Sequence, residues 1–567
     1  MSPAKYEAVS AEEDRPPGSA ESNEESSNGT HLTPESDSED DHDIAGLEGE
    51  EGLELKELRG RGKTRRIEQT AGGAEEEEDD EEEDYDEDDG ALGGRKRSRR
   101  DSVASFELYT PDEERKVRRK LDTRLVLFVA LLYLFSFLDR SNIGNAKVAG
   151  LTEDLHLSDS QYEWLLTAFY ITYILFEWMT LCFKIFPPHI YISVCVCCWG
   201  VLASLQSLAT SWAYMLVLRS LLGIGEAAFV GIPFYLSWFY RREELALRVG
   251  LFIAAAPLAT TFASSLAWAI VRFGSNTGIA PWRLLFLLEG FPACLIAVWA
   301  WFWIPDSPST ARWLNPRERK IATLRMRKES IASTTSGASS TVPRHKRKFQ
   351  WHLVLSTLRD PKSYLTAGIF FCCNVAFSSM PVFLPTIING MGFSKLASQG
   401  LAAPPFLFAF VVVLATAFIS DRIRSRSIPM MFHASFAFTG YLIATFAGLA
   451  QMGPTVRYAA TFPICAGFFS AVTIVITWTI NNQGSDEGKG TGMAVLNIIG
   501  QMGPLLGTRL YPDADKPYFV KGMSVCAGAM AVVFVLAFVL RMVLVKENRR
   551  RREGRRGREG GGLMYIT

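Results

Sequence analysis

Six ionisable residues stand inside long apolar stretches of the first half of the chain, where charged side chains are rare. They are Asp139, Arg140, Glu177, Arg219, Glu226 and Glu289. Ionisable groups within a membrane span cost a few kcal/mol each and usually face an internal cavity or one another. The sequence therefore predicts that these side chains gather around an interior site, where they pair with one another or carry protons.

The spacing of these charges predicts which of them meet. Arg219 and Glu226 are seven residues apart, which places them about 10 Å apart on nearly one face of a helix. Asp139 falls at a similar depth to Arg219 if their helices are neighbours, so we expect an ion pair there, whereas Glu226 has no evident base nearby. Such a pair either fixes helix packing or breaks and re-forms as a proton or substrate arrives, and an acid without a base suits a proton relay.

The second half of the chain offers uncharged polar groups inside its apolar stretches. They are Asn374, Ser378, His433, Asn481, Asn482, Asn497 and Gln501. This asymmetry indicates that one half carries the charge chemistry and that the other half completes the cavity.

Two further patterns are better explained by packing than by a ligand site. The glycines at 223, 225 and 231 have no strand before them, so close helix packing is expected in place of a phosphate-binding loop. All nine cysteines fall within apolar runs, which gives no disulfide framework. The three cysteines within 195–198 lie on different sides of a helix without a matching His or Asp, so we expect no metal site.

Positioning the interior charges requires membrane-spanning helices, each of roughly 20 apolar residues. Twelve stretches qualify: 125–144, 162–183, 190–208, 212–235, 246–271, 283–304, 363–388, 401–420, 428–449, 458–480, 490–510 and 519–545. Only one link between them, residues 305–362, is long. We predict an all-α membrane protein of 12 transmembrane helices in two six-helix halves, residues 121–304 and 363–548, joined by a linker over 305–362.

The chain ends are highly charged, unlike the spans. Residues 1–100 contain 33 Asp or Glu against 13 Lys or Arg and few apolar side chains, which predicts a disordered tail, assigned to residues 1–120. Its end contains Arg99-Arg100-Asp101-Ser102, a pattern for a basic-directed kinase with Ser102 as acceptor. The alternative is a solvated charge cluster beside a membrane.

The linker contains its own helix signal. Asn315, Pro316 and Glu318 form a helix start, because Asn caps, Pro takes the first position and Glu reaches back to the cap. We expect a short helix to about residue 328 and then a flexible stretch over 330–343.

Basic residues predict the orientation in the membrane. Six Lys or Arg precede the first span between residues 115 and 124, and eight follow the last span between 546 and 558, in a basic tail over 549–567. Loops on the opposite side are poor in Lys and Arg, so both termini and the linker are expected in the cytosol. Met1 is followed by polar and acidic residues, so no cleavable signal peptide is expected.

Several short motifs resemble one known family. The stretch L-D-R-S-N-I-G-N-A at 138–146 resembles the first-helix signature of the anion:cation symporter branch of the major facilitator superfamily, in particular its fungal allantoate-permease group. Arg219-x-x-x-Gly223-x-Gly225-Glu226 resembles its fourth-helix motif, and W-R-x-x-F-x-x-E-G-x-P at 282–292 resembles its sixth helix. Asp421-Arg422 resembles the superfamily's basic loop between helices eight and nine, and Trp478-x-x-Asn481-Asn482 the end of helix ten.

The resemblance has departures. The loop at 183–188 lacks the usual Asp and Gly, and M-T-L at 179–181 replaces the usual Pro-Ser-Asn. The fifth span has no Gly-Pro-x-x-Gly-Gly pattern, which superfamily antiporters often carry, so symport or uniport is favoured over exchange.

The resemblance implies a proton-coupled symporter of small organic anions that works by alternating access. Arg140 is the expected carboxylate clamp, because its planar fork binds both oxygens. The implied residues are Arg140, Asn142, Arg219, Asn374, Trp478 and Asn481 for substrate, Asp139 and Glu226 for protons, and Glu177, Glu289, Asp421 and Arg422 for gating. The implied coupling ion is the proton, without a cofactor. The expected partners are the organic anion and the lipid bilayer, and neither a nucleic acid nor a second subunit is expected.

Other function classes remain open. A non-transporting nutrient sensor on the same fold would signal through the tail, and a facilitated uniporter would carry a neutral solute without protons. A membrane enzyme is disfavoured, because no nucleophile–base or metal-ligand spacing is found. The plasma membrane is the usual setting of the branch, with the vacuole and endoplasmic reticulum as alternatives.

Overall fold

A computed structural model describes residues 109–274, 278–335, 351–423, 425–482, 486–555 and 565–567. The predicted disordered tail covers residues 1–120; residues 1–108, with Ser102, lie outside the described residues, whereas its last ten residues are helical, within α3 (Pro111–Leu121). All described residues belong to one compact unit, residues 90–567, and their regular structure is helical throughout.

The first half of the bundle is built around six helical passages, in the order of the predicted spans. They are α3 (Pro111–Leu121) with the π-helical turn η1 (Asp122–Val126) and α4 (Leu127–Val148); α6 (Asp159–Leu175) with η2 (Glu177–Lys184); α7 (Pro188–Gln206); α8 (Trp212–Ala227) with η3 (Ala228–Gly231) and α9 (Ile232–Leu236); α10 (Arg242–Ile253) with α11 (Ala255–Phe273); and α12 (Pro281–Trp303). A single helical turn, α5 (Leu151–Asp154), links the first two passages.

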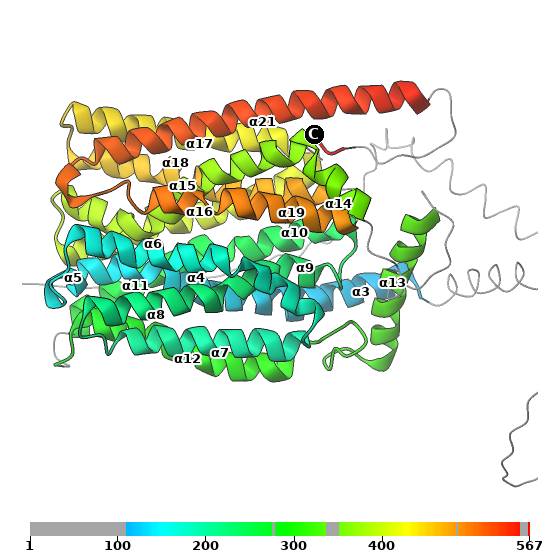
Figure 1. Cartoon of the computed structure of the whole chain (residues 1–567), viewed down its shortest axis with the longest axis horizontal. Coiled ribbons are helices and arrows are strands. Elements are labelled where there is room, and N and C mark those ends of the chain that lie inside the picture. The colour runs from blue at the N-terminus through cyan, green and yellow to red at the C-terminus, as the bar shows by residue number, and fades with distance from the viewer. Residues whose placement is uncertain (1–108, 275–277, 336–350, 424, 483–485, 556–564) are drawn as a thin grey trace, which may run out of the picture. The chain divides into compact units, whose positions relative to one another are not determined.

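The second half repeats the arrangement. Its passages are α15 (Pro361–Gly390), α16 (Lys395–Ile423), α17 (Ser427–Leu449), α18 (Pro454–Asn481), α19 (Asp486–Gly500) with α20 (Gly503–Gly507), and α21 (Val520–Arg555). The short turn η6 (Asp513–Asp515) precedes α21, and the linker carries α13 (Pro316–Thr335) and α14 (Trp351–Leu358). The passages lie side by side along the long axis of the bundle (Figure 1).

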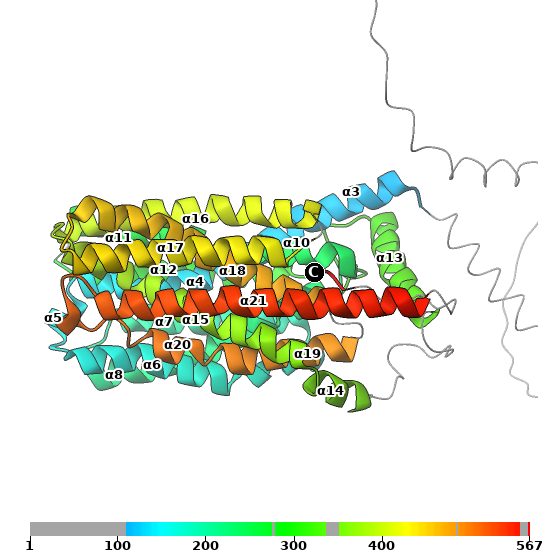
Figure 2. The same cartoon turned by 90° about the horizontal axis from the view of Figure 1, so that it is seen from above.

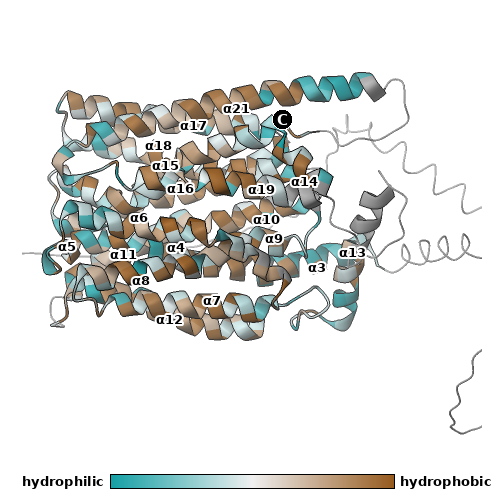
Figure 3. Cartoon of the chain, viewed as in Figure 1, coloured by the Kyte–Doolittle hydropathy of each residue, from teal (hydrophilic) through white to brown (hydrophobic). Residues whose placement is uncertain are grey.

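The predicted fold class is confirmed. In the described residues, ten helices are long and apolar enough to cross a membrane. The predicted second and eleventh spans are helical as well, but each is broken, into α6 with η2 and into α19 with α20. The spans are mainly apolar, whereas α3, α13 and the last turns of α21 are hydrophilic (Figure 3).

Local capping sets where the polar helices begin. Thr110 caps α3 reciprocally with Glu113, and Pro111 takes the first helical position. In the linker the Glu318 carboxylate accepts from the backbone N–H of Asn315 at 2.9 Å, as predicted. This helix, α13, continues to Thr335, so the first residues of the stretch predicted to be flexible are helical. Residues 336–350 lie outside the described part.

The glycines of the fourth passage pack as expected at two positions. A Cβ on Gly223 would overlap the backbone of Phe169 on α6, and one on Gly231 would overlap the Phe183 ring. Gly225 leaves ordinary contact distance to Trp199, so it is not required by packing.

The two ends of the bundle differ, and we name them by their elements. The linker end carries α3, α13 and α14, and the α5 end carries α5 (Figures 1 and 2). The turn η6 lies at the α5 end as well, because its Asp513 pairs with Lys147 near the end of α4. The halves meet mainly through α11 on α16, α4 on α15 and α10 on α18. These contacts place the charged residues of α4 and α8 in the interior.

Candidate functional site

A buried ion pair lies at the centre of the candidate site. Arg140 on α4 donates from Nε (3.2 Å) and Nη2 (2.8 Å) to Oε2 of Glu226 on α8, and Ser136 donates to the same oxygen at 3.1 Å. Glu226 is fully buried, and its other oxygen has no hydrogen-bond partner among the described residues. The expectation that Glu226 lacks a base is therefore wrong, because the helix rotation turns Arg140 toward α8.

Aromatic rings surround the Arg140 guanidinium. Its central carbon lies 4.7 Å from the ring centroid of Tyr173, 5.2 Å from Phe169 and 5.8 Å from Phe137. Phe169 and Tyr173 are four residues apart on α6, so they share one helix face. Cations over ring faces are stabilised electrostatically. Motif reasoning missed these rings, although their i, i+4 spacing was available as a signal.

The second half of the chain closes over this aromatic group. Phe137 packs edge-on against Phe377 of α15 with centroids 5.1 Å apart, and Phe469 of α18 lies 5.3 Å from Phe377. The Arg140 pair thus lies in the first half, next to the surface on which the two halves meet.

A second group of buried charges lies beside the first. Asp139, Asn142, Arg219 and Glu289 are each at most 3% exposed, and the Arg219 guanidinium lies over the Phe286 ring at 5.5 Å. Asp139, Glu226 and Glu289 are the charged neighbours of Arg219. The predicted Asp139–Arg219 ion pair is not formed, because no contact within 4.0 Å joins the two side chains.

The second group is poorly satisfied. Both carboxylate oxygens of Glu289, Oδ2 of Asp139, both amide atoms of Asn142, and Nε and Nη2 of Arg219 lack hydrogen-bond partners within the described part of the chain. Buried polar groups are normally bonded, so such orphaned atoms need an explanation. Glu289, predicted to act in gating, therefore lies in the same buried group as Asp139, predicted to carry a proton.

The second-half residues predicted to bind substrate lie elsewhere. Asn374 donates to the backbone oxygen of Gly500 at 3.1 Å and so holds α15 to α19. Trp478, near the linker end of α18, donates from Nε1 to the backbone oxygen of Ile566 at 2.9 Å. Asn481, partly buried at the end of α18, does not join the charged groups around Arg140. The structure therefore gathers Arg140, Asn142 and Arg219 but not the residues predicted from the second half.

The other predicted gating residues are at the linker end. Glu177 begins η2, and its Oε1 is buried without a hydrogen-bond partner among the described residues. Asp421 pairs with Arg426, which also donates to Ser420 at 2.7 Å. Arg422 is exposed.

Polar contacts join the two halves at the α5 end. Lys147 of α4 forms an ion pair with Asp513 of η6 at 2.9 Å, and Lys395 of α16 pairs with Glu153 of α5 at 2.6 Å. Three further contacts cross here: Gln399 to the Asn145 backbone oxygen, the hydroxyls of Thr167 and Thr508, and Arg509 over Trp164.

At the linker end the halves are held differently. Where side chains are described there, we find van der Waals contacts between the halves but no ion pair. Gly250 of α10 faces Ala417 and Thr473. The small pocket between them is lined by Leu247, Gly250, Asp421, Arg426 and Thr477, among others. Ion pairs between the two halves are thus found at the α5 end and not among the described side chains of the linker end.

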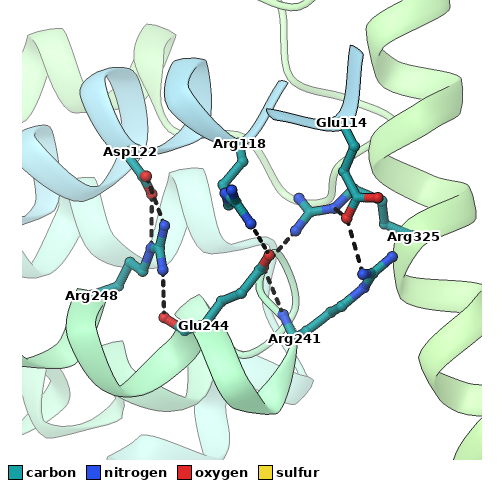
Figure 4. Close-up of polar contacts among 7 residues, drawn as sticks. All are labelled: Glu114, Arg118, Asp122, Arg241, Glu244, Arg248 and Arg325. Carbon is teal, nitrogen blue, oxygen red and sulfur yellow. Dashed lines mark hydrogen bonds and ion pairs between the residues drawn. The ribbon is translucent and has the colours of Figure 1, made fainter. Parts of the chain in front are cut away.

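An ion-pair network covers the linker end of the first half (Figure 4). Arg325 of α13 is fully buried and pairs with Glu114 of α3 at 3.0 Å and with Glu244 of α10. Glu114 also accepts from Arg241 at 3.0 Å, and Glu244 from Arg118 at 3.0 Å. Burial would raise the pKa of Glu244, but Arg325 and Arg118 outweigh it and hold the pKa below its usual range. The linker helix is therefore locked onto α3 and α10.

The family model of the major facilitator superfamily matches residues 129–508, well over half of the chain. The chain belongs to the major facilitator superfamily. It is a multi-pass membrane transporter, as its relatives are. An uncharacterized transporter of Schizosaccharomyces pombe is 30% identical over 446 residues, covering 78% of this chain and 88% of that protein. The high-affinity nicotinic acid transporter of Saccharomyces cerevisiae is 30% identical over 439 residues, covering 76% of this chain and 78% of that protein.

Solved structures agree with the fold. A proton:xylose symporter of the superfamily, bound to a bromo-deoxyglucose, aligns with a TM-score of 0.56 at 14% identity, over 74% of this chain and 96% of that one. A bacterial homologue of the human lysosomal transporter Spinster, in an inward-facing and occupied conformation, aligns with a TM-score of 0.51 at 16% identity, over 75% of this chain and 97% of that one. At these identities the likeness concerns the fold alone.

Proposed function

We propose that this transporter carries a small organic anion together with protons, as a member of the anion:cation symporter branch. The observation that supports this is the buried Arg140–Glu226 pair beside the surface where the halves meet. The guanidinium already holds one carboxylate, through Nε and Nη2. A substrate carboxylate has the same chemistry and competes for the same donors.

The Arg140–Glu226 pair supplies a mechanism of coupling. While Glu226 is ionised it occupies Arg140, and once it is protonated it holds the guanidinium less strongly. A proton on Glu226 therefore frees Arg140 for the substrate, and release of the substrate lets the pair re-form. Binding of the two species is coupled because they compete through one cation.

The charge balance of the interior supports proton binding. Three carboxylates (Asp139, Glu226 and Glu289) lie near two guanidinium groups (Arg140 and Arg219), which leaves one negative charge in excess when all are ionised. An uncompensated buried charge is costly, and uptake of a proton removes it. We assign Asp139 and Glu226 as proton carriers. The excess negative charge lies on Asp139 and Glu289, whose carboxylates belong to the same buried group.

The rings around Arg140 favour a flat carboxylate as substrate. Phe169 and Tyr173 flank the guanidinium and offer ring faces next to the point where a carboxylate would bind. Nicotinate, a carboxylate on an aromatic ring, has this shape, and one relative carries the name of a nicotinic acid transporter. We therefore place aromatic and vitamin-like monocarboxylates first among substrates.

The basic residues that precede the first span support an orientation with the linker end in the cytosol. We propose the plasma membrane as the location, and a monomer as the working unit. In this orientation the ion pairs of the α5 end close the site toward the outside.

Uptake of labelled nicotinate and other carboxylates into proteoliposomes, with and without an inward proton gradient, tests the proposal. We expect gradient-driven accumulation, its loss in Arg140→Ala, and exchange without accumulation in Glu226→Gln. Arg549→Ala, at an arginine 82% exposed near the linker end of α21, is the matched control and should transport normally. Saturable binding without flux would favour a sensor, and flux that ignores the gradient would refute symport in favour of uniport.

A further inference from the structure

Three residues near the end of the chain, Tyr565–Thr567, lie against the linker end of the second half. Their partners come from four helix ends: Lys362 at the start of α15, Ser425 to Ser427 at the start of α17, Trp478 and Asn482 at the end of α18, and Asn548 with Arg551 on α21. Residues 556–564, between α21 and this segment, lie outside the described part.

The backbone of the segment is bound by two asparagine side chains. Asn548 accepts from the N–H of Tyr565 at 2.9 Å and donates to its carbonyl oxygen at 2.9 Å. Asn482 makes the same pair of bonds with Ile566, at 2.9 Å and 3.1 Å, and the Trp478 indole adds a donor to the Ile566 oxygen. Each asparagine side chain thus bonds both the N–H and the C=O of one residue of the segment, as a neighbouring β-strand would.

The main-chain oxygen of Thr567 is held at the start of α17. It accepts from the backbone N–H of Arg426 at 2.7 Å, from the Ser425 hydroxyl at 3.0 Å, and from the N–H of Ser427 at 3.4 Å. Free N–H groups at a helix start are natural donors to such an oxygen. The helix start therefore fixes the end of the segment.

Cations bind the Tyr565 side chain. The Arg551 guanidinium lies 4.1 Å and the Lys362 ammonium 4.6 Å from the ring centroid. Arg551 also donates to the Tyr565 hydroxyl at 2.6 Å, and Lys362 does so at 3.4 Å. The ring is therefore the one side chain of the segment that the site recognises by its type, because the contacts described for Ile566 and Thr567 use main-chain atoms.

The site is built into the protein rather than formed by the segment alone. Trp478 is fully buried, and its indole N–H donates to the segment. A hollow lined by Lys362, Thr366, Trp478, Asn482 and Leu544, among others, lies beside it. When the segment leaves, the Trp478 indole and the Asn482 side chain lose these hydrogen bonds, and a peptide with the same main-chain groups can restore them.

We propose that the linker end of the second half is a binding site for an extended peptide with an aromatic residue, and that Tyr565–Thr567 occupies it as an internal ligand. The segment joins the ends of α15, α17, α18 and α21, so these ends separate only after the segment leaves. A second peptide of the same chemistry competes for the site. The proposal does not depend on the substrate or on protons.

Peptide binding to the full chain in nanodiscs tests this directly. The probe is a fluorescent pentapeptide, Gly-Gly-Tyr-Ile-Thr, measured by anisotropy. We expect saturable binding to a variant that lacks residues 565–567 and at least tenfold weaker binding to the wild type, whose own segment competes. The peptide Gly-Gly-Ala-Ile-Thr should bind the deletion variant about tenfold more weakly, because it lacks the ring.

Two further variants keep the test decisive if the deletion impairs folding. Tyr565→Ala in the full chain changes one side chain and should let the probe bind. Adding Asn482→Ala should weaken that binding about tenfold, because two hydrogen bonds are lost. Arg549→Ala, at an exposed residue that pairs with Glu553, is the control and should behave as wild type. Two results would overturn the proposal. One is equal probe binding to the wild type and to Tyr565→Ala, and the other is the absence of saturable binding both to the deletion variant and to Tyr565→Ala.

Discussion

Replacing Lys147 by methionine should open the α5 end of the transporter. The Lys147 ammonium forms an ion pair with Asp513 at 2.9 Å and lies 4.6 Å from the Tyr162 ring centroid. The side chains of the pair are 9% and 27% exposed, so water screens it only in part. Lys147 belongs to the first half and Asp513 to the second, so the pair forms only when the two halves meet at the α5 end. It therefore stabilises the closed arrangement and not the open one.

The size of the effect follows from distance and burial. Two unit charges at this separation attract by about 6 kcal/mol at an effective dielectric of 20, and desolvation cancels most of that. A net contribution of about 1–2 kcal/mol remains, which corresponds to a roughly 5- to 30-fold shift in population. Burial would raise the pKa of Asp513, but Lys147, together with Lys516, which pairs with Asp513 at 3.0 Å, outweighs it and lowers the pKa. The stabilisation is thus present above the usual Asp pKa and is lost as pH falls through the lowered value.

A double-mutant cycle with Lys147→Met and Asp513→Asn measures this contribution. The readout is the rate at which a membrane-impermeant maleimide labels Thr508→Cys, because Thr508 is buried between the halves and contacts Thr167. We expect Lys147→Met to raise the labelling rate 5- to 30-fold. The double variant should gain little more, since the pair is already broken.

The second ion pair at this end is the matched control. Lys395 and Glu153 are 55% and 63% exposed, so Lys395→Met should change labelling by less than about threefold. Equal effects of Lys147→Met and Lys395→Met, or an unchanged rate in Lys147→Met, would refute the reasoning that burial of the pair decides its contribution.

Two further predictions concern packing and the linker. Gly144→Ala should abolish uptake, because the added Cβ would overlap the Val382 backbone and keep the α5 end open. Gly250→Ala is the control, because its Cβ has ordinary contact space, and it should retain uptake. Maleimide labelling and uptake assays distinguish the two variants. Arg325→Met should lower the melting temperature by several degrees, because a fully buried cation of the linker helix is lost. The difference from wild type should be greatest above pH 4.5, the usual pKa of Glu244, and shrink as pH falls through its lowered value; a pH-independent difference would contradict the role of Glu244.

The sequence predicts the helices well, because helix signals are local. The start of the linker helix at Asn315 follows from three neighbouring residues, and the spans follow from composition. The central pair was harder to predict. Depth along a helix placed Asp139 beside Arg219, but it does not say which way a side chain turns, and Arg140, one residue on, is the residue that meets Glu226.

The residues at the end of helix ten show a different limit. The resemblance assigns Trp478 to the substrate, yet its indole binds Ile566, which is 88 residues away in the sequence. Nothing local to either residue indicates that contact. The Arg325 network is similar, because its partner Glu114 is 211 residues away. Long-range polar contacts of this kind require the folded structure.

The first passage is a long helix that reaches both ends of the bundle. From Pro111 to Val148 it is helical over 38 residues, about 57 Å, while the hydrocarbon core is only about 30 Å thick. One rod therefore carries Glu114 of the linker network, the central Arg140 and the α5-end Lys147, and a tilt of one degree about one end displaces the other by about 1 Å. A tilt of this helix would therefore shift the linker network, the central Arg140 and the Lys147–Asp513 ion pair together.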